Sequence, residues 1–307
     1  MIPSGCLPVL CSTFDADGQI DFDDFDRLID FVIDCGVDGC VFPGVASEVE
    51  TLIPEERERM IRHLGARLAG RLPIVVGASA ATAEETVSHI RIGAEAGATA
   101  AMVMAPSVAG REAAGQIAHF RAIERQAALP VMLQNAPAPA GAALAPETVA
   151  EVASTVRAIE AVKEETMPCG QNLTRIRTAA GNGIRGVFSG AGGRYITDEL
   201  ARGALGTLPA AELADLHARL YRAWADGDEA EARRLYRVSM PLLNFQAIFR
   251  MQMTKEVLRL RGVLHHTFVR SAGSRMDEGD RAELYALLRQ AAPEFDRHPV
   301  LWQAAAE

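Results

Sequence analysis

The chain has 307 residues, 49% of them hydrophobic and 23% charged, which is typical of a globular protein with a sizeable core. Its formal net charge of −9 disfavours a nucleic-acid partner, because an acidic surface repels phosphate backbones. No uncharged apolar run reaches the roughly 18 residues of a membrane span, so we expect no membrane partner either.

Eight short apolar runs predict buried strands. Their residues are apolar on both faces, as in parallel strands covered by helices on one side and by a packed interior on the other. The runs are Cys6–Cys11, Gly39–Phe42, Pro73–Val76, Ala100–Met104, Val131–Gln134, Val156–Lys163, Ile184–Phe188 and Ala204–Leu208. Eight strands with intervening helices in about 210 residues indicate a (β/α)₈ barrel. A doubly wound open sheet is the alternative, but no GxGxxG motif follows a predicted strand.

Helical patterns separate these runs. The segment Asp23–Asp34 places its apolar residues on one stripe, and Pro54 begins the next helix with two acids in the first turn. Thr82 has the position of an N-cap, with Glu85 completing a capping box. Further helices are expected at Gln116–Ala128, Pro146–Ser154 and Leu173–Ala180.

The strand pattern stops after about residue 210, and only helices are expected beyond it. Gly227 and Gly262 mark breaks between them. We therefore expect a catalytic barrel over residues 1–225 and a C-terminal helical extension over residues 226–307. The expected helices are Glu212–Ala225, Glu229–Leu243, Phe245–Arg261 and Asp277–Ala291.

Lys163 is the one candidate amine at a predicted strand end, since the chain has only two lysines. In such a barrel the active site lies at the carboxyl ends of the strands. Ile159, Ala161 and Lys163 share one face by the period of two, and an inward lysine would be desolvated, which lowers its pKa. A neutral amine can form a Schiff base with a ketone. A structural Lys163 paired with Glu164 or Glu165 is the alternative.

Glu165 and Ser47 are candidates on the same reasoning. Glu165 lies two residues beyond Lys163, so a carboxylate there could move protons beside an imine, or could only neutralise the lysine. Ser47 begins the pattern Ser-Glu-Val-Glu, which has the form of a capping box. The helix that it would cap offers free N–H groups for a substrate carboxylate.

The pattern of possible ligands argues against a metal or another cofactor. The seven histidines fall in predicted helices or in the tail, and none forms an HxH or HExxH motif. No P-loop or GxSxG motif occurs. The five cysteines are an odd number without a CxxC pair, which favours reduced thiols and a cytoplasmic location.

Several segments carry a resemblance to a known family: Gly5–Phe14, Gly44–Glu48, Gln134–Pro137 and Lys163-Glu164. Nearly from end to end, the chain resembles the dihydrodipicolinate synthase / N-acetylneuraminate lyase family of class I aldolase-like barrels. The resemblance implies that Lys163 forms the Schiff base with a 2-keto acid and that the loop after the second strand holds its carboxylate. It also implies a homo-oligomer, either a dimer or a tetramer.

The departures from the family's pattern bear on the reaction. The usual Gly-Thr-Thr-Gly-Glu is here Gly-Val-Ala-Ser-Glu, and the catalytic tyrosine of Tyr-Asn-x-Pro is here Gln134. The tyrosine pair after the fourth strand is here Ser107-Val108, so a relay of tyrosine hydroxyls cannot exist. The chain is similar instead to the L-2-keto-3-deoxyarabonate dehydratase type, which has Gln before an Ala-Pro and Lys-x-Glu-Thr at the Schiff-base strand.

The expected function is therefore that of a lyase that dehydrates a 2-keto-3-deoxy sugar acid through an imine on Lys163, with Glu165 as base, acid or both. Retro-aldol cleavage that releases pyruvate is one alternative, and a non-catalytic keto-acid-binding protein is another. The residues expected to contact the substrate are Val45, Ala46, Ser47, Gln134, Gly190 and Leu208.

Overall fold

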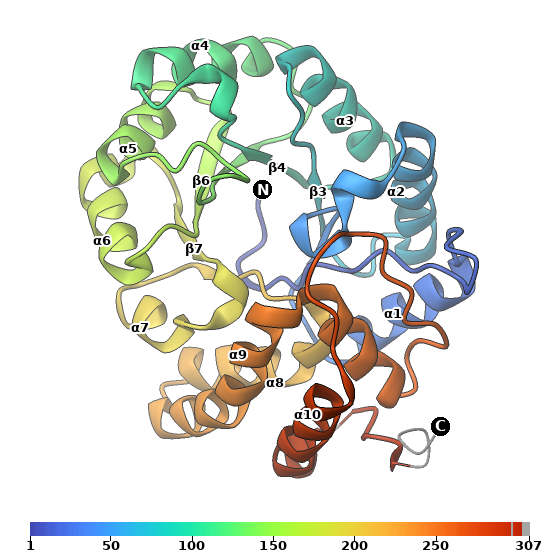
Figure 1. The fold of residues 1–307 in the computed structure, drawn as a ribbon. Helices are drawn as coiled ribbons and strands as arrows, with labels where there is room; N and C mark the ends of the chain where they lie inside the picture. The colour runs from blue at the N-terminus through green and yellow to red at the C-terminus, as the bar shows by residue number, and fades with distance from the viewer. Residues whose placement is uncertain (296, 303–307) are drawn as a thin grey trace. The chain divides into compact units, whose positions relative to one another are not determined.

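The computed structural model describes residues 1–295 and 297–302. Within those ranges eight strands alternate with eight helices, and two further helices follow (Figure 1). The strands are β1 (Gly5–Cys6), β2 (Cys40–Phe42), β3 (Ile74–Gly77), β4 (Ala100–Met104), β5 (Val131–Asn135), β6 (Ile159–Glu164), β7 (Gly186–Ser189) and β8 (Gly206–Thr207). The helices are α1 (Phe22–Asp34), α2 (Pro54–Leu68), α3 (Ala83–Glu95), α4 (Ala113–Glu124), α5 (Pro146–Thr155), α6 (Cys169–Ala180), α7 (Ile196–Ala201), α8 (Ala214–Ala225), α9 (Glu229–Leu260) and α10 (Glu278–Ala291).

The chain packs into two compact units. The first consists of Met1–Gly5 and Ile61–Leu208, and the second of Cys6–Met60 and Pro209–Glu307. Each unit therefore combines two segments that lie apart in the sequence. The boundary expected at residue 225 lies inside the second unit and stays a prediction.

In the first unit, parallel strands lie side by side in the order β8-β7-β6-β5-β4-β3. Their residues are almost all buried, and consecutive helices from α3 to α7 pack against one another or against these strands. The first of these helices begins as expected, because the Thr82 hydroxyl accepts the Glu85 N–H and Glu85 reaches back to Thr82. Apolar strands of this kind need such cover, because both of their faces exclude water.

The register of β6 against β5 decides which side chains lie next to one another in the candidate site. Lys163 is directly beside Gln134 of β5, and Glu164 is beside Asn135. A register shift between β5 and β6 leaves Glu160 as an extra residue. The expected alternation is therefore wrong at one point: Ala161 and Lys163 share a face, but the shift separates Ile159 from them.

In the second unit, α9 packs against both α8 and α10 (Figure 1). The expectation of two helices divided at residue 244 is wrong, because α9 continues through that position and includes Pro241. The interruption lies instead at Arg250, whose φ of 43° and ψ of −117° are not helical. No helix-breaking residue type marks this position in the sequence.

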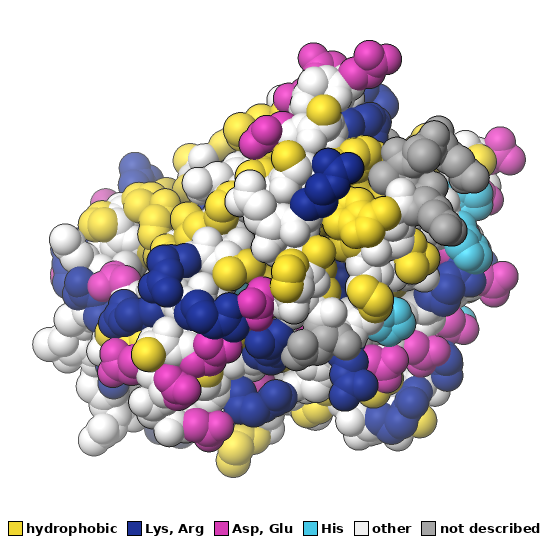
Figure 2. Space-filling model, turned by 90° about the horizontal axis from the view of Figure 1, so that it is seen from below, with side chains coloured by type: hydrophobic (Ala, Val, Ile, Leu, Met, Phe, Trp, Pro, Cys, Tyr) yellow, Lys and Arg dark blue, Asp and Glu magenta, His cyan; other side chains and the backbone are white. Residues whose placement is uncertain are grey.

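The helices and one face of the molecule can be compared with the expectations from hydropathy and charge. None of the helices in the described ranges is long and apolar enough to cross a membrane. On the face shown in Figure 2, acidic and basic side chains are interspersed.

Candidate active site

Lys163 lies near the carboxyl end of β6 and is only 5% exposed. Its Nζ is 3.0 Å from Oε1 of Glu165. The side chain of Gln134, on the neighbouring strand, reaches the same carboxylate. The structure therefore brings together three of the residues that the sequence singled out.

The Glu165 carboxylate is held from three directions. Gln134 donates its Nε2 proton to Oε2 at 2.6 Å, and the Ala191 N–H donates to Oε1 at 3.3 Å. Burial by itself would raise the pKa of Glu165, but the positive charge of Lys163 and these hydrogen bonds outweigh it and lower the pKa. Glu165 is thus held as a carboxylate, which can accept a proton and can stabilise positive charge on the lysine nitrogen.

Gly190 allows the chain to approach Glu165 closely. A Cβ at this position would lie 2.2 Å from Cγ of Glu165, so a larger residue would displace the carboxylate. Ala191 follows with a φ of 49°, and its N–H points at Glu165. Leu208, also expected near the substrate, is buried, and its N–H donates to the Ser189 carbonyl at 3.2 Å.

Glu164, the other carboxylate expected as a possible partner of Lys163, lies on the opposite face of β6 and bonds to other groups. Its carboxylate accepts hydrogen bonds from Asn135 Nδ2 at 2.8 Å and from the N–H of Thr166 at 2.6 Å, and the Thr166 hydroxyl donates to it as well. Asn172 of α6 contacts Thr166, so this face is turned toward the helices. Burial raises the pKa of Glu164 to about 7 in spite of these hydrogen bonds.

A second carboxyl group lies near it on the helix side. Glu199 of α7 is completely buried and accepts a hydrogen bond from the Ser189 hydroxyl at 2.5 Å. In the part of the chain that the structure describes, its Oε1 has no hydrogen-bond partner. Burial raises the pKa of Glu199 to about 7, and the nearby charges of Glu164 and Glu165 contribute. Nothing in the sequence around Glu199 marked it as a buried carboxyl group.

The loop Val45–Ser47 after β2 lies in the second unit and forms a single short turn. The Ser47 hydroxyl accepts the N–H of Gly44 at 2.8 Å and donates to the Leu10 carbonyl. The expectation that Ser47 caps the following helix is wrong, because Glu48 adopts a left-handed conformation with a φ of 55°. Val45 is 37% exposed and Ala46 is half-buried.

The Glu48 side chain at this turn contacts residues that lie far away in the sequence. Lys255 Nζ lies 2.5 Å from its Oε1, and both side chains are fully buried. The N–H groups of Arg270 and Ser271 donate to Oε2 at 2.8 and 2.7 Å. Lys255 also donates to the Phe268 carbonyl at 2.6 Å. The second lysine of the chain is therefore part of a buried structural network, which its sequence context did not reveal.

Metal ligands do not gather among the described residues, where no group of three His, Cys, Asp or Glu side chains could hold an ion. All five cysteines are buried free thiols. Burial raises the pKa of each thiol above its usual range, which opposes formation of the metal-binding thiolate.

The chain is similar to one protein family over nearly its whole length. A sequence model of the dihydrodipicolinate synthetase family matches residues 2–291. L-2-keto-3-deoxyarabonate dehydratase from Azospirillum brasilense is 28% identical over 293 residues, which cover 94% of each chain. A 4-hydroxy-tetrahydrodipicolinate synthase from Stenotrophomonas maltophilia (strain R551-3) is 36% identical over 178 residues, which cover 57% of this chain. Alignments with it and two other such synthases span 51–60% of the length of those proteins.

A further relative has a solved structure. "Putative 2-dehydro-3-deoxy-D-gluconate aldolase YagE" from Escherichia coli (strain K12) is 28% identical over 299 residues, which cover 94% of this chain and 96% of that protein. The structure of YagE in complex with pyruvate matches with a TM-score of 0.84 over 94% of this chain and 98% of that chain. The strand–helix alternation and this likeness confirm the predicted (β/α)₈ fold class with C-terminal helices.

Proposed function

Because the chain belongs to the dihydrodipicolinate synthetase family, we propose that it is a lyase whose Lys163 forms an imine with the C2 ketone of a 2-keto acid. The proposed reaction is dehydration of a 2-keto-3-deoxy sugar acid. The contact that carries this proposal is that of Lys163 with Glu165, whose carboxylate is held by an amide, Gln134. An amide side chain does not exchange a proton as a phenol can, so the proton carrier beside Lys163 is assigned to Glu165.

The reaction can be written with these groups. The Lys163 amine adds to C2 and water leaves, which gives a positively charged imine. The Glu165 carboxylate takes a proton from C3, and the electron pair moves toward the nitrogen to form an enamine. The enamine then expels the C4 hydroxyl, which leaves as water with the proton that Glu165 holds. Hydrolysis of this conjugated imine returns the lysine and releases an unsaturated 2-keto acid with a C3=C4 double bond. For a 2-keto-3-deoxypentonate, tautomerisation of this product moves the double bond to C4=C5, and the enol at C5 becomes the second carbonyl of a dicarbonyl acid.

The remaining substrate contacts are proposed from the family resemblance. Val45, Ala46 and Ser47 are assigned to the substrate carboxylate, and Gly190 and Leu208 remain assigned as strand-end contacts. The Ser47 hydroxyl already bonds to main-chain groups of its own unit. Main-chain groups of this loop are therefore the better candidates for holding a carboxylate.

The test is to trap the imine with borohydride in the presence of a 2-keto-3-deoxypentonate and to locate the added mass by peptide mass spectrometry. We expect the mass on the peptide that contains Lys163. Labelling should disappear in Lys163→Ala and persist in Glu151→Gln, a change at an exposed position of α5. Labelling that persists in Lys163→Ala would refute the assignment of the imine.

The products separate dehydration from the alternatives. Dehydration leaves a single dicarbonyl acid, whereas retro-aldol cleavage releases pyruvate. The name of the YagE relative, an aldolase, supports testing cleavage directly. Tight binding without turnover over a panel of 2-keto acids would favour a non-catalytic binding protein.

We also infer a homo-oligomer, a dimer or a tetramer, from the family resemblance, and a cytoplasmic location from the free buried thiols. Light scattering of the purified protein measures the oligomeric state, and a monomer would contradict the first inference.

A further inference from the structure

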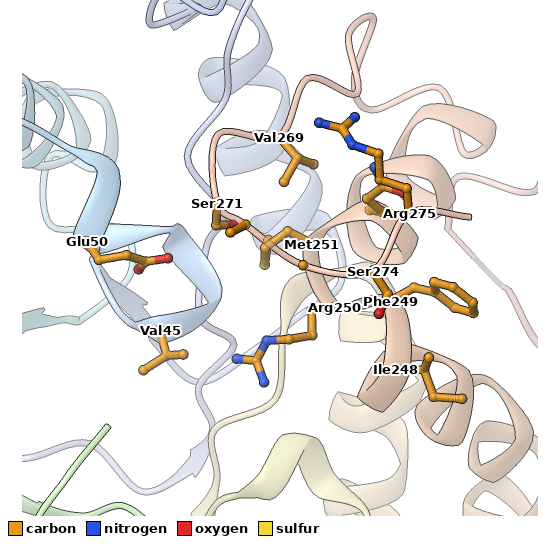
Figure 3. Close-up of a pocket in the computed structure, with 13 residues that line it drawn as sticks. Val45, Glu50, Ile248, Phe249, Arg250, Met251, Val269, Ser271, Ser274 and Arg275 are labelled. Atoms are coloured by element: carbon orange, nitrogen blue, oxygen red, sulfur yellow. The ribbon is translucent and has the colours of Figure 1, made fainter. Parts of the chain in front are cut away.

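A pocket of about 290 Å³ lies within the second unit, at the small end of the range of ligand sites (Figure 3). Its walls come from the loop after β2, from α9 where that helix is interrupted, and from the segment 269–275. Two of its lining residues, Arg250 and Arg275, are positively charged, and one, Glu50, is negatively charged. The pocket therefore carries a net positive charge, which favours an anionic ligand.

Arg250 is the most unusual residue of this pocket. Its φ of 43° lies in the region that favours glycine, so the backbone is strained at this residue. In Figure 3 its guanidinium extends from α9 toward Val45. The side chain is exposed, and no ion pair or hydrogen bond of its guanidinium is found among the residues that the structure describes. Its charge is thus free to meet a ligand.

Hydrogen bonds hold the segment 269–275 near its start, at Ser271, and at Met276, the residue that follows it. The hydroxyl of Ser271 donates to Glu48 Oε2 at 2.9 Å, beside the hydrogen bond from its N–H. The N–H of Met276 donates to Gln252 Oε1 at 2.8 Å. Residues 272–275 between these points are exposed. The pocket therefore has anchored sides and polar, accessible groups at its mouth.

We propose that this pocket binds a small organic acid that carries hydroxyl groups, with Arg250 as the ion-pair partner of its carboxylate. A guanidinium can hold a carboxylate by two parallel hydrogen bonds. Ser274 and Glu50 offer a hydroxyl and a carboxylate for the ligand's own hydroxyl groups. Val45, which the family resemblance assigns to the substrate, lines the same pocket. The choice of a hydroxy acid rests on the proposed function, whereas the positive charge of the pocket does not.

The experiment is calorimetric titration of the full-length protein with D-gluconate and with the neutral D-gluconamide. Gluconate has no ketone and cannot form an imine, so the outcome does not depend on Lys163. We expect gluconate to bind and gluconamide to bind at least about tenfold more weakly, the loss that one charge-assisted hydrogen bond produces. Borohydride trapping at Lys163 tests the proposed function separately.

Two variants of Arg250 complete the test. Arg250→Gly removes the guanidinium and relieves the backbone, so its melting temperature should be unchanged or higher while gluconate affinity falls at least about tenfold. Arg250→Gln should show the same loss of affinity, and Arg237→Gln, at an exposed position of α9 outside the pocket, should show none. Absence of gluconate binding to the parent, equal binding of gluconamide, or unchanged affinity in the Arg250 variants would overturn the proposal.

Discussion

Replacement of Glu165 by glutamine tests the proposed proton carrier most directly. The parent carboxylate is 3.0 Å from Lys163 Nζ and accepts hydrogen bonds from Gln134 and from the Ala191 N–H. A glutamine has nearly the same shape and can still accept the Ala191 hydrogen bond. Its NH₂ group then takes the place of Oε2 and faces the Nε2 donor of Gln134, whose amide must turn to accept a hydrogen bond. The variant therefore removes the charge and the ability to hold a proton, with little change in volume.

The expected magnitude follows from this geometry. Two unit charges 3.0 Å apart attract by about 5 kcal/mol at an effective dielectric constant of about 20, before desolvation is counted. That attraction acts on the positive nitrogen of the ammonium and of the imine alike, so most of it cancels when the imine forms. The contribution of Glu165 to proton transfer at C3 and C4 is made only in the transition state, so it is lost in full in the variant. General acid–base catalysis of this kind contributes roughly 10²–10⁴-fold to the rate. At about 1.36 kcal/mol per factor of ten, the barrier should rise by about 3–5 kcal/mol.

The assay measures kcat for dehydration and, in parallel, the extent of borohydride trapping. We expect Glu165→Gln to be trapped like the parent while kcat falls by roughly 10²–10⁴-fold. Glu151→Gln, the same chemical change at an exposed position of α5, should leave both unchanged. A kcat for Glu165→Gln within about threefold of the parent, far from the range expected of a proton carrier, would place that carrier elsewhere.

Three other predictions concern pH, buried charge and metal. Glu199→Gln should weaken the pH dependence of folding: burial raises the pKa of Glu199 from 4.5 to about 7, so the folded chain holds a proton that the unfolded chain releases. The parent should lose on the order of 3 kcal/mol of stability as the pH rises through this window, and equal free energies of unfolding of the parent in urea titrations at pH 5 and pH 8 would contradict this. Lys255→Met should lower the free energy of unfolding by about 3–5 kcal/mol, because it leaves the buried carboxylate of Glu48 without its cation, and adding Glu48→Gln should recover part of the loss. A loss below about 1 kcal/mol in urea denaturation would argue that the pair is not buried as described. Activity should be unchanged in excess EDTA, because the imine supplies the electron sink; loss of activity restored by a divalent ion would refute this.

The central strands were the most predictable part of the fold, whereas β1 is Gly5–Cys6 and not the expected Cys6–Cys11. β4 spans the predicted residues Ala100–Met104, and β5 exceeds its prediction only by Asn135. Both strands are buried on two faces, so an apolar run and a strand coincide. The ends of helices were predicted less accurately than the strands. The helix expected at Gln116–Ala128 is α4, Ala113–Glu124, because no strong cap marks either of its ends.

A residue of the candidate site could be predicted only where its position in the sequence alone marks it as unusual. Lys163 could be found because an amine at the end of an apolar strand is uncommon. The burial and the hydrogen bonds of Glu164 and Glu199 could not be predicted, since an acidic residue is exposed in most proteins. Neither the left-handed turn at Glu48 nor the interruption at Arg250 has a local signal. The partner of Glu48 lies 207 residues away, beyond the reach of any periodicity.

The contacts of Glu48 have a consequence for shortening this protein. The side chain and main-chain groups that hold its carboxylate come from Lys255, Arg270 and Ser271, which lie 207–223 residues further along the chain. A truncated form that ends at residue 225 would retain every strand yet leave a buried carboxylate with none of these donors. The loop after β2, which bears Val45–Ser47, would then lose the anchor next to it. The helices and loops that follow the last strand therefore help to hold a loop that precedes the third strand, and they are not a removable appendage.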